Sequence, residues 1–188
     1  RRDGLIHEYG ATADSRVEST PTATPREWAL NRVRDRDGNF FDITYTEDSS
    51  TGVHRPVLMT YGGNLNTGAA PYYRLQFRYE ARPAADVPYT FHAGTVSSHA
   101  LRLDRIDVLH VDTGRTVHSF DLGYDVTGAT GRSRLATLQE CGSDACLAPT
   151  QFSWSSAPAG WTGEVMVNVP AAQFPSALPG DGGGDRFG

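Results

Sequence analysis

Lysine is absent from the sequence, so all 17 of its basic residues are arginine. Either side chain serves a solvated surface, and we attribute the preference for arginine to a GC-rich genome. No run approaches the roughly eighteen apolar residues of a membrane-spanning helix, which excludes such a span. A formal net charge of -5 excludes a general nucleic-acid binder, because that function requires a surface that neutralises phosphates.

The sequence also lacks an initiating methionine, because residue 1 is arginine and no charged-then-apolar leader follows it. We therefore expect the chain to be an interior piece of a longer polypeptide. Its 188 residues, 38% of them apolar, suffice for one globular core. We expect one β domain over residues 1–170. Residues 171–188 thin to Ala, Pro and Gly, which is typical of a linker or the start of a following unit.

Helical periodicity is missing as well, whereas strand periodicity is clear. In residues 72–82, Tyr73, Leu75, Phe77 and Tyr79 alternate with polar residues, which predicts a strand with one buried and one wet face. The 20 Gly and 11 Pro mark turns at short intervals. The sequence therefore predicts an all-β fold of antiparallel hairpins with little or no helix, arranged as a β-sandwich or an open curved sheet.

Local patterns refine this prediction. Residues 27–34 and 40–47 form an expected hairpin across 35–39, where Asp-Gly and Gly-Asn tolerate the turn geometry. In residues 99–111 the apolar positions change from odd (Leu101 and Leu103) to even (Ile106 and Val108) near Asp104-Arg105. One extra residue at that point would keep all four side chains on one side of the strand, so we predict a β-bulge. Residues 11–25 lack periodicity, and we expect an exposed connection.

Cys141 and Cys146 are the only two cysteines, and they lie in a polar loop after an expected strand. A zinc site needs four ligands, and no histidine is close in the sequence. We predict a local disulfide, with reduced thiols as the alternative. The chain-entropy estimate for so short a loop is about 2 kcal/mol, and a disulfide implies an oxidising compartment.

Sequence motifs for catalysis are lacking: there is no nucleophile elbow, His-Glu-x-x-His pair or phosphate-binding glycine loop. His7 with Glu8, and His110 with Asp112, are candidate acid–base pairs, and Glu140 is a further carboxylate. Nothing in their spacing brings them together, so we assign no catalytic residue and no cofactor. A small carboxylate- or histidine-dependent hydrolase stays an alternative, decided by whether two of these groups meet in a cleft.

Tryptophan offers a second alternative function. Trp28 and Trp154 lie within strand patterns, and we expect them in the core. Trp161 lies between Gly and Thr and is the candidate exposed ring. An exposed ring suits stacking on a sugar, so the alternative is a carbohydrate-binding β-sandwich.

Asp181 and Asp185 flank three glycines and give the look of a shortened calcium loop. Hard cations need six or more oxygen ligands. Two carboxylates fall short of such a set, so these residues are weak candidates and we predict no metal.

Two blocks of the sequence resemble a known family. Residues 3–10 and 28–45 resemble the Rhs/YD-type pattern, in which strands are joined by an Asp-x-x-Gly-Asn turn and followed by a tyrosine; here these are Asp35-x-x-Gly38-Asn39 and Tyr45, within the second block. Residues 131–154, from Gly-Arg-Ser-Arg-Leu to Pro-Thr-x-Phe-x-Trp, resemble the SpvB-type N-terminal region. That region occurs in the Salmonella virulence protein SpvB and in the B components of insecticidal toxin complexes.

The resemblance implies a non-catalytic role. In the toxin-complex relatives this β-rich region belongs to the assembly that encloses and delivers a toxic C-terminal polypeptide. It precedes FG-GAP propeller repeats, and residues 180–185 lie where the first repeat begins, although a middle acidic or amide residue is missing. The implied partners are other domains of the same polypeptide or toxin-complex subunits, and the implied location is secreted or cell-surface. Strands cut from such a shell leave edges, so we expect either self-association through an edge or edges protected by Pro and Arg.

Overall fold

The computed structural model describes residues 4–19, 22–48, 51–92, 95–128 and 131–154. Contacts within the chain divide it into Arg1–Ser156 and Ala157–Gly188. All described residues belong to the first unit. The expected domain boundary at residue 170 lies outside the described residues and stays a prediction.

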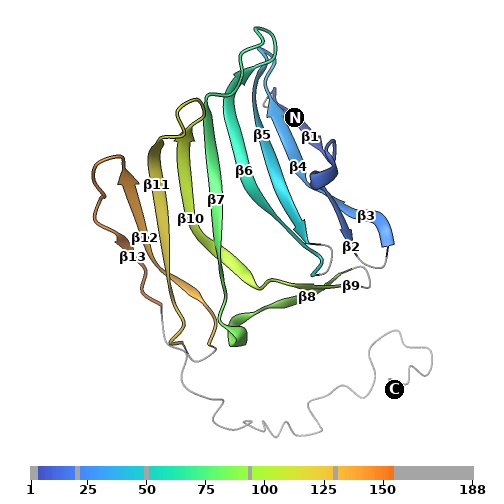
Figure 1. The fold of residues 1–188 in the computed structure, drawn as a ribbon. Coiled ribbons are helices and arrows are strands. Elements are labelled where there is room, and N and C mark those ends of the chain that lie inside the picture. Colours follow the sequence, from blue (N-terminus) through green and yellow to red (C-terminus); the bar gives the residue numbers. More distant parts are fainter. Residues whose placement is uncertain (1–3, 20–21, 49–50, 93–94, 129–130, 155–188) are drawn as a thin grey trace, which may run out of the picture. The chain divides into compact units, whose positions relative to one another are not determined.

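The first unit is built on one large antiparallel sheet, which Figure 1 shows as a single layer. The all-β class is confirmed, and of the two expected architectures the structure has the open sheet. Both edge strands are short, which limits the free edge that another strand could pair with. The strands, in spatial order, are β1 (Ile6–Tyr9), β4 (Leu30–Arg34), β5 (Asn39–Asp48), β6 (Val53–Asn64), β7 (Tyr73–Ala81), β10 (Leu101–His110), β11 (Thr116–Asp125), β12 (Arg134–Gly142) and β13 (Thr150–Gln151).

Two small hairpins accompany the large sheet. The expectation of a plain connection over residues 11–25 is wrong, because this stretch holds the 3₁₀ turn η1 (Ala13–Ser15), β2 (Arg16–Ser19) and the start of β3 (Thr22–Trp28). Val17 is the only apolar residue of β2, and the apolar residues of β3 are Ala23, Pro25 and Trp28, so these strands show no run of large alternating apolar side chains. The other hairpin, β8 (Tyr89–His92) with β9 (Thr95–Ser98), follows the second 3₁₀ turn, η2 (Ala84–Asp86).

The hairpin of β4 and β5 is confirmed at the expected turn. Gly38 takes φ +86°, which favours glycine. Asp35 closes the turn, because its carboxylate accepts hydrogen bonds from the Asn39 backbone at 2.9 Å and side chain at 2.8 Å. These contacts, the side-chain one first, lower the pKa of Asp35.

The predicted bulge is confirmed as well. The register between β7 and β10 shifts between Leu103 and Arg105, which leaves Asp104 as the extra residue. A bulge leaves a carbonyl without its regular partner in the ladder. Here the Tyr124 hydroxyl of β11 donates to the Leu103 carbonyl at 2.6 Å.

The same arrangement recurs twice in the sheet. In each case a tyrosine reaches the neighbouring strand and donates its hydroxyl to the carbonyl of a residue that flanks a register shift. Burial is the first cause that raises the pKa of all three tyrosines, so they stay protonated donors at neutral pH. We call them the bridging tyrosines: Tyr45 to Leu30 at 2.8 Å, Tyr79 to Pro56 at 2.7 Å, and Tyr124 to Leu103.

Candidate interaction surface

One face of the large sheet consists of apolar side chains, and we call it the apolar face. Residues directly opposite in antiparallel strands point to the same side, so cross-strand pairs trace it. One row runs Ile43, Met59, Leu75 and Val108 across β5, β6, β7 and β10. The other members, which pair with these rows or lie two residues along the strands, are Phe41, Tyr61, Tyr73, Phe77, Tyr79, Ile106, Phe120, Leu122 and Leu138.

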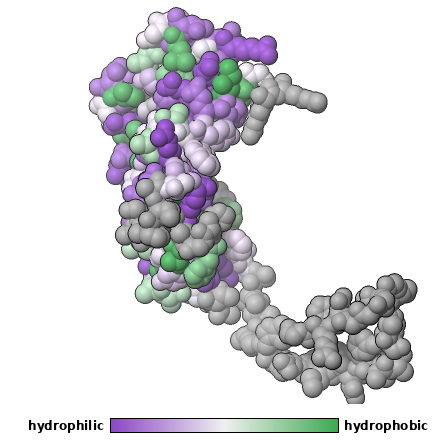
Figure 2. Space-filling model, turned by 90° about the vertical axis from the view of Figure 1, so that its right-hand side faces the viewer, coloured by the Kyte–Doolittle hydropathy of each residue, from purple (hydrophilic) through white to green (hydrophobic). Residues whose placement is uncertain are grey.

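All members of the apolar face are half-buried rather than buried. Among the described residues the large strands mainly contact their hydrogen-bonded neighbours, and no second layer packs on them. The apolar residues that are buried are Val17, Val33, Val53 and Leu109. Of these, Val33 pairs with Phe41 and lies on the same side of the sheet, at the β4 margin of this face. Viewed from the β1 side, hydrophobic residues lie at the surface among hydrophilic ones (Figure 2).

The placement of Trp28 and Trp154 in the core is wrong. Their exposed fractions are 57% and 53%. Neither residue lies on a strand of the large sheet: Trp28 ends β3 in the small hairpin with β2, and Trp154 follows β13. Trp154 instead binds the edge of the sheet, because its Nε1 donates to the Leu135 carbonyl at 2.7 Å.

The opposite face, which we call the polar face, is covered by paired charges. Asp107 is only 3% exposed and accepts hydrogen bonds from Arg78 at 2.5 Å and Arg105 at 2.6 Å. Arg105 also reaches Asp121 at 2.9 Å. Burial alone raises the pKa of Asp107, but the hydrogen bonds from Arg105 and Arg78 outweigh it and lower that pKa. Charges on this face are thus neutralised within the chain.

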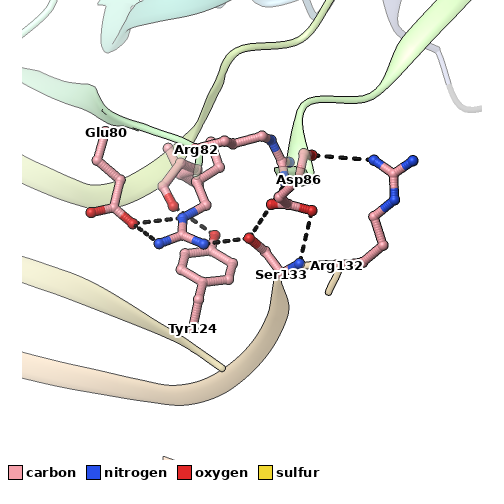
Figure 3. Close-up of polar contacts among 8 residues, drawn as sticks. Glu80, Arg82, Asp86, Tyr124, Arg132 and Ser133 are labelled. Carbon is pink, nitrogen blue, oxygen red and sulfur yellow. Dashed lines mark hydrogen bonds and ion pairs between the residues drawn. The ribbon is translucent and has the colours of Figure 1, made fainter. Parts of the chain in front are cut away.

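A second polar cluster joins η2 to the start of β12 (Figure 3). The Asp86 side chain is 1% exposed and accepts from Arg82 Nη1 at 2.8 Å and the Ser133 amide at 2.9 Å. The Ser133 hydroxyl also donates to this carboxylate. These contacts, led by the Ser133 hydroxyl, lower the pKa of Asp86 to about 2.

Arg102 extends this cluster across the sheet. It donates to Glu80 at 2.6 Å and to the Ser133 hydroxyl, and its guanidinium lies 4.3 Å from the centre of the Tyr124 ring. The donors and acceptors of the cluster bind one another, which is the arrangement of a structural tie between strands.

The structure does not bring the candidate acid–base residues together. Within the described part of the chain, no hydrogen bond or ion pair joins any two of His7, Glu8, His110, Asp112 and Glu140. His7 and Glu8 lie on β1, and four strands separate β1 from the β10 strand of His110.

These groups have other neighbours. Glu8 pairs with Arg34 at 3.1 Å, and Glu140 lies 3.5 Å from His118. His110 packs edge-on against Tyr73 and borders an open cavity of about 390 Å³. No carboxylate lines that cavity, so it holds no acid–base pair; its walls are Tyr73, His110, Thr113, Arg115, Val117 and Ser143.

In the structure the sulfur atoms of Cys141 and Cys146 are bonded at 1.98 Å. The Gly142 amide donates to the Ala145 carbonyl at 2.8 Å inside the loop that they close. That the protein carries this disulfide in its own compartment stays a prediction.

The remaining candidates lie outside the described residues. They are Trp161, Asp181 and Asp185, so neither sugar stacking nor calcium binding at these positions is tested. Within the described residues, no group of three or more metal-ligating side chains gathers. No helix in that part of the chain has the length and apolarity to cross a bilayer.

Solved structures with this fold come from bacterial toxins. The Tc holotoxin pore of Photorhabdus luminescens matches with a TM-score of 0.66 and 17% identity, over 81% of this chain and 10% of its own. The crystal structure of TcdB2-TccC3 matches at 0.64 and 14%, over 80% and 10%. The N-terminal domain of effector protein SpvB from Salmonella typhimurium strain LT2 matches at 0.59 and 16%, over 74% and 58%.

The chain has the SpvB-type fold. The structural matches confirm the SpvB-type resemblance drawn from its sequence. The Rhs/YD-type resemblance stays a prediction. No protein-family model and no curated protein sequence matches the chain. It spans about a tenth of the length of the toxin-complex chains that it matches.

Proposed function

We propose that the chain is a non-catalytic structural β domain of a large bacterial protein of the toxin-complex kind. In this role it contributes to the scaffold that encloses or delivers a toxic C-terminal region. The observation that carries the proposal is the fold shared with TcdB2-TccC3, the Tc holotoxin and the SpvB N-terminal domain. The partners are further domains of the same polypeptide or toxin-complex subunits, and the location is secreted or cell-surface.

The described side chains support a structural role. Asp86 and Asp107, the two carboxylates that are at most 3% exposed, are both held by arginines of the chain. The candidate acid–base residues are dispersed over the sheet. A domain built this way holds strands at fixed positions, and a shell needs such rigidity.

The test uses the polypeptide as its gene encodes it. Limited proteolysis measures how fast the region that follows this domain is digested in the parent and in the Asp86→Ala variant. Asp86→Ala breaks the tie between η2 and β12, so we expect faster digestion of the following region. Asp144→Ala, at an exposed loop position, is the matched control and is expected to digest like the parent.

Equal digestion rates in the parent and in Asp86→Ala, with circular dichroism showing that the variant domain has lost its structure, would refute the scaffold role. A gene product without any region after this domain would refute it as well.

A further inference from the structure

We infer that the apolar face is an interdomain interface, covered in the complete protein by an apolar surface of another domain of the same polypeptide. The inference deepens the proposed function and rests on it, because it requires a longer polypeptide. It names the face of the sheet that contacts another domain, and it states that the contacting surface of that domain is apolar.

The two faces of the sheet differ in how deeply their side chains are buried. On the polar face, Asp107 is 3% exposed, Ser119 2% and Leu109 7%. The arginine side chains that pair with carboxylates also cover this face with their apolar stems. On the apolar side only Val33, at the β4 margin, is buried to that degree, at 5% exposed, whereas the members from β5 to β12 are half-buried.

The apolar face has an area suited to an interface. It crosses six strands, about 29 Å at the usual strand spacing. It runs for seven residues on β7, about 24 Å, and for three residues or fewer on each of the other strands. Its area is therefore about 330 Å², within the roughly 300–600 Å² of the largest apolar patch on a typical monomer, a patch that is often functional.

The chemistry of the face selects an apolar partner. The hydroxyl of Tyr79 already donates to a backbone carbonyl of the sheet. This tyrosine therefore presents mainly ring carbon to a partner. A sugar would need hydrogen-bonding groups here, whereas the apolar side of a second sheet packs on such a surface at about 10 Å.

The matched toxins indicate where that partner is encoded. In the Tc holotoxin and TcdB2-TccC3 the matched region is 10% of the chain. Most of the polypeptide is then available in cis. A tethered partner has an effective concentration in the millimolar range, so it needs no high intrinsic affinity to stay docked.

Met59 is a native probe of this inference, because it lies in the middle of the apolar face between Ile43 and Leu75. Methionine oxidation by hydrogen peroxide follows exposure. The oxidation rate of Met59 is measured by peptide mapping in the complete gene product and in the 188-residue chain at low concentration. Mapping separates Met59 from Met166, the only other methionine. We expect oxidation of Met59 to be slower by about tenfold or more in the complete product.

Equal rates in the two proteins, with Met59 accessible in both, would overturn the inference. Slow oxidation in both, together with a dimer of the 188-residue chain in light scattering, would also overturn it by showing that a second copy covers the face. Neither outcome depends on the proteolysis of the following region, so failure here is distinct from failure of the scaffold role.

Two substitutions at neighbouring positions of β7 provide a second test of the inference. Leu75 lies on the apolar face and Gln76 on the polar face, and both are half-buried. In the complete product, Leu75→Glu is expected to raise the oxidation rate of Met59 towards that of the 188-residue chain, whereas Gln76→Glu leaves it unchanged. Equal effects of the two variants, with circular dichroism showing that both are folded, would contradict the assignment of the face.

Discussion

Replacing the three bridging tyrosines by phenylalanine should destabilise the sheet additively. Each Tyr→Phe change keeps the ring and removes the donor to a carbonyl beside a register shift. The carbonyl is then left without that partner, at about 1 kcal/mol for a typical hydrogen bond and up to about 3 kcal/mol where water cannot replace it. The variants are Tyr45→Phe, Tyr79→Phe, Tyr124→Phe and the triple combination.

Additivity follows from the spacing of the sites. β5, β7 and β11 are each two strands apart, or about 10 Å, at which distance mutational effects usually add. The triple variant should therefore lose about 3 kcal/mol. For a chain of this length, 1 kcal/mol corresponds to about 2–4 °C in Tm, so the expected decrease is about 6–12 °C.

Thermal unfolding, followed by circular dichroism, measures the change in Tm. Denaturant titration measures the change in the free energy of unfolding. Tyr89→Phe is the matched control, since Tyr89 is 61% exposed and its hydroxyl meets water. Its effect should stay within about 0.5 kcal/mol. A triple variant that unfolds at the same temperature as Tyr89→Phe would refute the bridging function of these hydroxyls.

Three further outcomes follow from local contacts. The pKa of Asp86 is about 2 in the fold, below the ordinary value of about 3.9. Its contribution to stability is therefore complete above about pH 4 and is lost as the pH falls towards 2. Between about pH 4 and 2, the free energy of unfolding of Asp86→Asn should depend less on pH than that of the parent, as acid unfolding would measure. Replacing Cys141 and Cys146 by serine should lower the free energy of unfolding by about 2 kcal/mol, and an unchanged midpoint together with free thiols in the parent would refute the disulfide. Gly62→Ala should lower Tm more than Gly68→Ala in thermal scans: both have positive φ, but a Cβ at Gly62 would lie 2.6 Å from the Tyr72 ring, whereas nothing lies within 4 Å at Gly68.

Local chemistry was sufficient to predict several elements of the fold. The turn at Asp35 to Asn39 depends on a glycine and on side chains four residues apart. The bulge at Asp104 depends on the parity of apolar residues within a single strand. Such signals are contained in short segments, so the sequence alone was enough.

Features that depend on distant segments could not be predicted in this way. Asp86 and Ser133 are 47 residues apart, and nothing around either position indicates the other. Asp107 is another example, because a carboxylate on the polar side of a strand is ordinarily solvated. Here Arg78 comes from the neighbouring strand and Arg105 from two residues earlier in the same strand, and only the sheet order places them around it.

A further limit of sequence patterns concerns what lies over a strand. Period-two alternation records that a strand has an apolar side, but it contains no information on what covers that side. For Tyr73 to Tyr79 the alternation is as regular as in a sandwich core, yet the described part of the chain supplies no second layer. This regularity, on a side that the described residues leave half-exposed, is the observation behind the interface that we propose for the apolar face. The protection of Met59 in the complete protein is the measurement that tests it.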